Sequence, residues 1–411
     1  MSTFSSICLA LLSGLLVSNV YGTANIYSEA VEKLTAANSK FAVDLYREII
    51  AQPKTVNVVF SPVSVSAALA MVKLGTKKNS TKQIAEALHL KDVEASLINS
   101  AFGELNGLLF DKPKDNITLK GANGAFISKT VSVLNDYKNA LSVFGAKIGD
   151  LDFGDKASVS HINKWISQET GDLIPNMLND DDLDATTALV LVNTLYFTGE
   201  WHSGFTPMHT DKRAFYVSHY RIINTAFMYQ RGKFRFRYIE SLSLQVLELP
   251  YVDQDISMYL FLPDNFDLAS VEKNLNYENL TNWISNMDYE TVDITLPKFK
   301  VEAGIELQKS LQNLGIKDIF SSGQADLSGI SGDKSLFVDA IFHKGVLEVN
   351  HLGGLVEAER EEANRTPADK RIMFYADHPF IFLIKNMKSG VMYQLGAFKR
   401  PEGKEQNHDE L

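Results

Sequence analysis

Residues able to do covalent or acid–base chemistry are few and scattered in this chain of 411 residues. The single cysteine, Cys8, lies in the apolar N-terminal run, so the rest of the chain can form neither a disulfide nor a thiolate nucleophile. The sequence also lacks four motifs that mark nucleotide, zinc and serine-hydrolase sites: G-x-G-x-x-G, G-x-x-x-x-G-K-[ST], H-E-x-x-H and G-x-S-x-G. We therefore expect no catalytic site, no cofactor and no metal.

Two other features favour structural roles over chemistry. An acidic run supplies carboxylate oxygens but lacks the glycine and glutamate of a calcium loop, which favours a solvated loop (Asp180, Asp181, Asp182, Asp184). His343 stands in an apolar strand-like run, where a hydrogen-bonded core histidine is commoner than a base or a ligand. Neither feature predicts an enzyme.

Residues 351–371, HLGGLVEAEREEANRTPADKR, form the most unusual stretch of the chain. Apolar, strand-like runs flank it on both sides, yet it begins with paired glycines and continues as a charged tract without a hydrophobic period. This pattern leaves two interpretations, a linker or an exposed loop.

Both ends of the chain carry targeting signals. The run ICLALLSGLLVSNVYG has the length and the small-residue ending of a signal peptide, which predicts removal of residues 1–22 and a mature chain from Thr23. The tail, residues 404–411, ends in HDEL, the endoplasmic reticulum retrieval signal (His408, Asp409, Glu410, Leu411). We expect a protein of the endoplasmic reticulum lumen that a retrieval receptor binds, with secretion from the cell as the alternative.

Four N-x-[ST] sequons would be open to glycosylation in that compartment, although so short a pattern also occurs by chance (Asn79, Asn116, Asn279, Asn364). The formal net charge of -10, without any block of basic residues, argues against nucleic acid and anionic membranes as partners. No later run approaches 18 apolar residues, so we expect no membrane insertion. The chain also lacks a linker or repeat, so we expect residues 23–403 to form a single domain. We also expect a monomer.

Helical patterns come first along the chain and strand patterns dominate later. Apolar residues at helical spacing predict helices at 33–50, from Val63 to 75, in 84–110 and at 161–170. The second half has β-branched and aromatic runs such as 187–201, 244–252, 256–264, 291–299, 336–349 and 379–386, with one helical pattern at 304–315. This order indicates an α+β fold with large, mostly antiparallel sheets.

Several of these segments together resemble the serpin family over essentially the whole mature chain. NVVFSPVSVSAALAMVKLG is similar to the family's buried helix with its preceding Ser-Pro turn, and LVNTLYFTGEWHSGFTPMHTDKRAF to its long central strand and the segment that follows. LPKFKVE, LQNLGIKDIFSSGQADLSGI, FHKGVLEVN, ADHPFIFLIKN and LGAFKRP follow in the family's order. The resemblance implies a serpin fold with three β-sheets, eight or nine helices and an exposed reactive loop at about 351–375.

The resemblance also implies a mechanism and a partner. In the family a serine endopeptidase cleaves the loop and is trapped as an acyl-enzyme while the loop enters the main sheet as a new strand. Ser64, Asn193 and His343 match the family's shutter cluster beneath that sheet, and Trp201 matches its breach, where insertion begins.

The loop departs from the family at its hinge, where inhibitory members have Glu-Glu-Gly-Thr followed by alanines. A strand alternates its side chains, so the family's phase turns every second loop residue inward. Gly354, Val356 and Ala358 suit the core, whereas Arg360 and Glu362 would cost on the order of several kcal/mol each to bury unpaired. This predicts insertion that stalls part-way. The candidate hinge residues are Gly353, Gly354, Leu355, Val356, Ala358 and Arg360.

The family's loop length places the reactive bond near Pro367 and Ala368. The nearest cations that a trypsin-like or dibasic-cleaving protease would recognise are Arg365, Lys370 and Arg371, although solubilising charges are the simpler explanation. Two functions therefore stay open. One is a suicide-substrate inhibitor of serine endopeptidases, and the alternative is a non-inhibitory serpin acting as a binding or chaperone-like protein in the endoplasmic reticulum.

Overall fold

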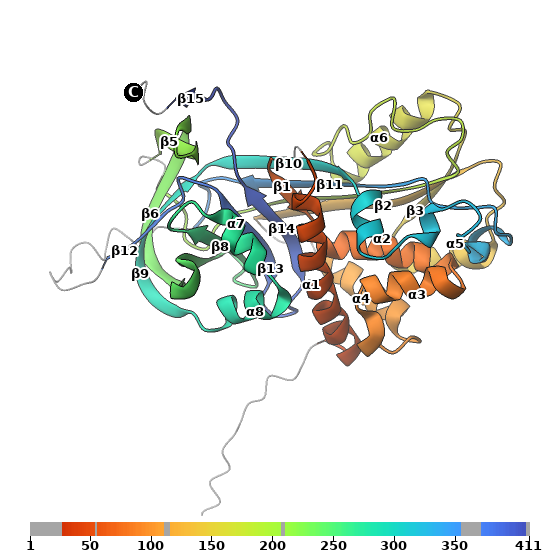
Figure 1. Cartoon of the computed structure of the whole chain (residues 1–411), viewed down its shortest axis with the longest axis horizontal. Helices are drawn as coiled ribbons and strands as arrows, with labels where there is room; N and C mark the ends of the chain where they lie inside the picture. Colours follow the sequence, from red (N-terminus) through yellow and green to blue (C-terminus); the bar gives the residue numbers. More distant parts are fainter. Residues whose placement is uncertain (1–26, 54–55, 111–115, 207–209, 355–370, 408–411) are drawn as a thin grey trace, which may run out of the picture.

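The computed structural model describes residues 27–53, 56–110, 116–206, 210–354 and 371–407. Strands make up two hydrogen-bonded sheets. The helices α2–α5 lie at the end of the molecule opposite β5, β6, β9 and β12, with α1 between the two ends (Figure 1). The helices are α1 (Glu29–Ile50), α2 (Pro62–Gly75), α3 (Lys78–Ala87), α4 (Ile98–Phe110), α5 (Asn135–Leu141), α6 (Ala157–Thr170), α7 (Leu268–Asn274), α8 (Tyr277–Ser285), α9 (Gln308–Asn313) and α10 (Ser328–Ser331).

The five-stranded sheet has the order β10-β11-β4-β2-β3, and the ten-stranded sheet runs β1-β14-β13-β8-β7-β6-β9-β12 with β5 and β15 also paired to β6. The strands are β1 (Val58–Phe60), β2 (Ile117–Ser128), β3 (Lys147–Leu151), β4 (Leu189–Gly199), β5 (Asp211–Ser218), β6 (Arg221–Ile239), β7 (Leu244–Pro250), β8 (Ile256–Pro263), β9 (Asp288–Pro297), β10 (Phe299–Glu306), β11 (Ala340–Val349), β12 (Ile372–Tyr375), β13 (Phe380–Asn386), β14 (Met392–Phe398) and β15 (Gln406–Asn407).

The expected α+β fold is confirmed, with two differences in detail. Two of the three expected sheets are joined through the 19-residue strand β6, which pairs with β5 and β9 along most of its length and with β7 at its end. The described residues contain ten α-helices rather than eight or nine, and the extra element is short, since α10 has four residues.

The central strand β4 of the five-stranded sheet is buried on both faces, as its apolar run predicts, whereas the edge strands β10 and β3 are partly exposed. One face joins the main core with α2, which is apolar on all sides and begins at Pro62 behind the N-cap Ser61, one residue before the expected Val63. The other face packs against α6 through Ile162, Trp165 and Ile166. A central strand of this sheet therefore cannot move without disturbing a helix layer.

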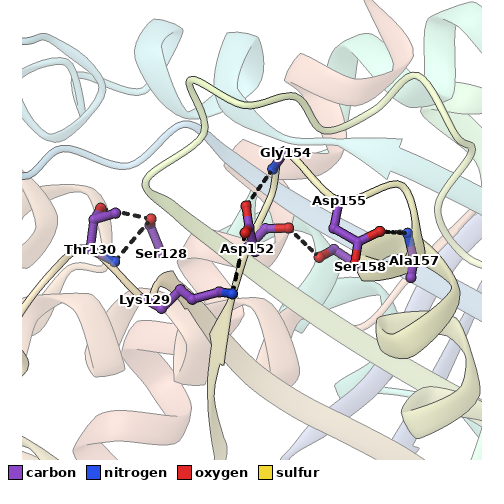
Figure 2. Close-up of polar contacts among 8 residues, drawn as sticks. All are labelled: Ser128, Lys129, Thr130, Asp152, Gly154, Asp155, Ala157 and Ser158. Carbon is purple, nitrogen blue, oxygen red and sulfur yellow. Dashed lines mark hydrogen bonds and ion pairs between the residues drawn. The ribbon is translucent and has the colours of Figure 1, made fainter.

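Polar contacts around a tight turn fix the start of α6 (Figure 2). The Asp152 carboxylate accepts from the Gly154 N–H at 3.1 Å and faces Lys129 Nζ at 3.2 Å, while the Ser158 hydroxyl donates to the Asp152 carbonyl at 2.7 Å. These contacts join α6 to the ends of β2 and β3. Salt weakens the exposed ion pair, so the hydrogen bonds contribute most of this anchor.

One predicted helix is shorter than its pattern. The helix expected at 304–315 begins only at Gln308, because Gly304 and Glu306 belong to β10 and pair with Lys344 and Phe342 of β11. Pairing with a long neighbouring strand therefore overrides the local helical pattern.

Candidate functional site

The seam between β4 and β11 is the central feature of the candidate site. The two strands pair directly and in parallel from Ala340↔Val190 to Glu348↔Thr198, with no strand between them among the described residues. Parallel neighbours both run toward the same end of the sheet, so a third strand could enter the seam from that end. The segment expected to carry the reactive loop leaves β11 there.

A row of polar side chains crosses this seam in the middle of the sheet. The strand registers place Asn123 of β2, Asn193 of β4 and His343 of β11 side by side. His343 Nδ1 lies 2.6 Å from Asn193 Oδ1, and Asn193 Nδ2 donates to Asn123 Oδ1. The Ser61 N–H donates to His343 Nε2 at 2.9 Å and so ties the row to the start of α2.

These contacts fix the protonation of His343. Because Nε2 accepts from a backbone N–H, the ring proton must lie on Nδ1 and be donated to Asn193. The ring is fully buried, and burial lowers its pKa from 6.5 to about 3. His343 is therefore a neutral hydrogen-bonding link between strands, as the sequence predicts for a core histidine.

Ser64 differs from its expected role in that cluster. It is buried in the first turn of α2, but its side-chain oxygen has no hydrogen-bond partner among the described residues. Its N–H donates to the Ser61 hydroxyl at 3.3 Å, because Ser61 caps the helix. The hydrogen bond that reaches His343 thus comes from Ser61, three residues earlier on the same turn.

Trp201 closes the open end of the seam. Its indole is 1% exposed and stacks on Tyr251 with ring centroids 4.5 Å apart. The indole N–H donates to the Asn350 carbonyl at 2.8 Å, just past the end of β11. Trp201, just after the end of β4, is therefore linked by its side chain to the residue that follows β11.

Backbone hydrogen bonds also attach the hinge residues Leu352 and Gly354 to Trp201 and Gly204. The Trp201 N–H donates to the Leu352 carbonyl at 2.9 Å, and the Gly354 N–H donates back to the Trp201 carbonyl at 3.0 Å. The Gly204 N–H donates to the Gly354 carbonyl at 3.2 Å. The start of the loop is thus attached beside β4 before any insertion.

Close backbone approach explains the paired glycines of the hinge. A Cβ at Gly353 would lie 2.6 Å from the Trp201 carbonyl oxygen, and one at Gly354 would lie 2.6 Å from that of His202. Both distances are shorter than a non-bonded carbon–oxygen contact allows, and the neighbouring atoms belong to the backbone. Glycine is therefore required by packing at these two positions, besides any flexibility it gives the hinge.

The loop expected at 351–375 ends before residue 372, where a strand begins. Ile372–Tyr375 form β12, which pairs with β9, so these four residues belong to the ten-stranded sheet. Arg371 immediately before it places Nε 3.4 Å from Oδ2 of the buried Asp293. The Tyr229 hydroxyl donates to the other oxygen of that carboxylate at 2.6 Å.

The other predicted loop residues lie outside the described part of the chain. They are Leu355, Val356, Ala358, Arg360, Glu362, Asn364, Arg365, Pro367, Ala368 and Lys370. The retrieval signal, His408, Asp409, Glu410 and Leu411, and the signal peptide, residues 1–22, lie outside it as well.

The described sequons differ in their accessibility. Asn79 and Asn116 are exposed, at the start of α3 and in the turn before β2. Asn279 is half-buried on α8, where its side-chain amide donates to the Asn274 carbonyl at 2.7 Å. Exposure therefore favours the first two, and at Asn79 a glycan would replace the hydrogen bond that the side-chain amide donates to Asp318 Oδ2 at 2.7 Å.

Sequence reasoning missed three residues that complete the site: Ser61, Asn123 and Asp293. A polar residue inside an apolar strand is the one available signal for Asn123 and Asp293, and it does not name the partner. Across the described ranges, no group of three or more His, Cys, Asp or Glu could hold a metal ion. The same ranges contain no helix long and apolar enough to span a membrane.

Comparisons with known proteins agree with this arrangement. A family model described as "Serpin (serine protease inhibitor)" matches residues 36–401. Leukocyte elastase inhibitor of Xenopus laevis is 36% identical over 379 residues, which cover 90% of this chain and 100% of that protein. Iripin-2 of Ixodes ricinus is 35% identical over 383 residues, covering 91% of this chain and 95% of that protein.

Two solved structures share the fold. Uncleaved ovalbumin matches with a TM-score of 0.84 at 29% identity, covering 90% of this chain and 100% of that one. Maspin matches with a TM-score of 0.83 at 28% identity, covering 91% of this chain and 100% of that one.

Proposed function

This chain belongs to the serpin family, and on that premise we propose that it inhibits serine endopeptidases as a suicide substrate. The observation that carries the proposal is the seam of two directly paired parallel strands, with Gly354 attached at its open end to Trp201. Strand addition at such a seam replaces one parallel ladder by two antiparallel ones, which favours insertion. The related leukocyte elastase inhibitors add support through their names.

The proposed reaction consumes the inhibitor. The target's serine Oγ attacks the carbonyl carbon of the scissile bond, the C–N bond breaks, and the leaving amine takes a proton from the protease's own general acid. The loop segment before the cut stays esterified to the protease and enters the seam as a new strand. The chain therefore acts as a trap and does not turn over as an enzyme.

We propose a basic target specificity, trypsin-like or dibasic, with Arg365 as the recognised residue rather than Arg371. A protease active site needs several extended residues free on both sides of the cut. Arg371 pairs with the buried Asp293, and its next neighbour, Ile372, is already paired in β12. Arg365 lies six residues before this anchor.

The second candidate is a non-inhibitory serpin that binds or assists other proteins in the endoplasmic reticulum. Its support is the retrieval signal HDEL together with the charged residues Arg360 and Glu362 at inward loop positions. Burying an unpaired charge costs on the order of several kcal/mol, which would favour simple cleavage over trapping.

We further propose that residues 1–22 are removed as a signal peptide, that the monomeric chain is retained in the endoplasmic reticulum lumen by the HDEL receptor, and that some escapes to the outside. In that compartment, Asn79 and Asn116 are the favoured glycan sites because both are exposed.

One experiment decides between the two functions. The purified protein is incubated with trypsin and, separately, with a dibasic-specific protease, and the products are examined on denaturing gels and by thermal melting. A complex stable in SDS and a higher melting temperature are expected. Loop cleavage without a complex and without that rise would exclude trapping and leave the non-inhibitory function.

A further inference from the structure

Basic side chains alternate with core residues along β6. Phe234 and Phe236 pack in the main core, whereas Arg231, Lys233 and Arg235 occupy the alternate positions. Alternate residues of a strand share a face and lie about 6.6–6.8 Å apart, so these three cations form a row on the face away from the core. Because other residues separate them, the sequence shows no basic block at this place.

The neighbouring strands extend this face with exposed apolar groups. Tyr289 of β9 lies opposite Arg235. Asp293 lies opposite Arg231 on one side and opposite Met373 of β12 on the other. Directly opposed residues share a face of a sheet, so all of them belong to one surface. Tyr289 is 74% exposed and Met373 is 65% exposed, and both residue types are enriched in protein interfaces, as arginine is.

Two guanidinium groups share one carboxylate at the centre of this face. Asp293 Oδ1 lies 4.0 Å from Arg231 Nε, and Asp293 Oδ2 lies 3.4 Å from Arg371 Nε. Arg231 Nη1 is buried and has no hydrogen-bond partner among the described residues. The side chain of Arg371 is 56% exposed. The group therefore keeps one positive charge, and Arg371 presents it at the surface.

The other cations of the row make the face positive as a whole. Arg235 Nη1 donates to Glu248 Oε2 of β7 at 2.8 Å, whereas Lys233 is exposed and has no ion pair within the described part of the chain. The exposed Glu290 of β9 lies opposite Phe234 and so belongs to the other face. Four basic side chains thus meet two carboxylates, on a chain with a formal net charge of -10. Such a local positive surface attracts an anionic partner.

The place of this face beside the predicted loop identifies that partner. β6, β9 and β12 lie at the end of the molecule away from α2–α5 (Figure 1). Arg371 follows the loop directly, and Arg365, the proposed recognition residue, precedes it by six positions. Six residues span at most about 20–22 Å, which is comparable to the radius of gyration of a 200-residue protease domain, about 16–17 Å. A protease bound at Arg365 is therefore held within reach of this face.

We propose that this face binds an acidic region of the target protease while the loop occupies the protease's active site (Arg231, Lys233, Arg235, Tyr289, Arg371, Met373). The inference rests on the proposed inhibitory function and deepens it, because it adds an acidic surface to the basic cleavage specificity of the target. Opposite charges accelerate the encounter and make its rate depend on salt. Tyr289 and Met373 then supply the apolar contact area.

The test uses two trypsins of opposite net surface charge, an anionic and a cationic form, which share a specificity for cleavage after Arg and Lys. Association rate constants with each trypsin are measured at about 0.05 and 0.5 M NaCl, where the screening lengths differ about threefold. The proteins are wild type, Lys233→Glu and Lys91→Glu. Lys91 is the matched control, because it is exposed in the 3₁₀ turn Leu90–Asp92 after α3, at the other end of the molecule, and gives the same change in net charge.

Lys233→Glu should associate with anionic trypsin about three- to tenfold more slowly than wild type at low salt, and within about twofold of wild type at high salt. With cationic trypsin it should associate at least as fast as wild type. Lys91→Glu should match wild type within about twofold in all four conditions. Lys233 is exposed, so thermal melting should show all three proteins equally folded.

The outcomes separate this inference from the function beneath it. Equal effects of Lys233→Glu and Lys91→Glu, or equal slowing with both trypsins, overturn the basic face and leave inhibition intact. If the trypsins cleave the loop without forming an SDS-stable complex, trapping is overturned; the cleavage rates then replace the trapping rates and decide on the face by the same comparison. If neither trypsin cleaves the loop, both proposals are overturned.

Discussion

Acidification should weaken the fold through His343. The ring is neutral and fully buried, and its pKa falls from 6.5 to about 3, so the unfolded chain binds one more proton than the folded chain between these values. The contribution of the neutral His343 ring to the free energy of unfolding is therefore complete above pH 6.5 and is lost as the pH falls toward 3. At about 1.4 kcal/mol per pH unit, the free energy of unfolding loses about 2 kcal/mol by pH 5.

The assay is urea unfolding followed by tryptophan fluorescence at pH 7, 6 and 5, using the first cooperative transition. Carboxylates also titrate as the pH falls, so the effect of His343 is obtained by comparison with the His343→Gln variant. Between pH 7 and pH 5 the free energy of unfolding of this variant should fall by about 2 kcal/mol less than that of wild type. His161→Gln is the control, because His161 is exposed on α6. Equal pH dependence in wild type and His343→Gln would refute the assignment of a buried neutral imidazole.

Three further predictions test the hinge, the loop and the sequons. Gly353→Ala should lower the free energy of unfolding by about 1–3 kcal/mol in thermal or urea melts, because the added Cβ would crowd the Trp201 carbonyl. Gly304→Ala is the control and should cause no such loss, because a Cβ there meets open space. Equal losses in the two variants would contradict the crowding. With trypsin, Arg365→Ala should abolish the SDS-stable complex and Arg371→Ala should retain it, and the reverse result would place the cut at β12. Asn79→Gln, in protein expressed through the secretory pathway, should remove one endoglycosidase-sensitive step in gel mobility, and an unchanged band would show the site unoccupied.

The sequence predicted the fold class well because each element has a local pattern. The all-round apolar helix after the Ser-Pro turn and the β-branched run of β4 depend on neighbouring residues alone, so both are confirmed as α2 and β4. The pattern at 304–315 is wrong at its start, since the pairing of Gly304 with Lys344 competes with it from 40 positions away in the chain. Local periodicity does not report such a competitor.

The sequence likewise predicted some residues of the candidate site but not the reasons for them. Residue types and collinear motifs were enough to select Trp201, His343 and the paired glycines, because unusual residues in apolar surroundings are visible in the sequence itself. The reason for the glycines was not visible, since the Trp201 and His202 carbonyls that exclude a Cβ approach only in the folded chain.

The sequence by itself determined the order of the elements and the family resemblance that their motifs carry. Only the tertiary structure decided the partners: Asn193 with Asn123 and His343, Arg371 with Asp293, and Gln394 with both strands of the seam. These partners are far apart in the chain. The asparagines and His343 meet through strand register, where a shift of one residue would turn each side chain to the opposite face, and Gln394 meets the seam because the two sheets pack together.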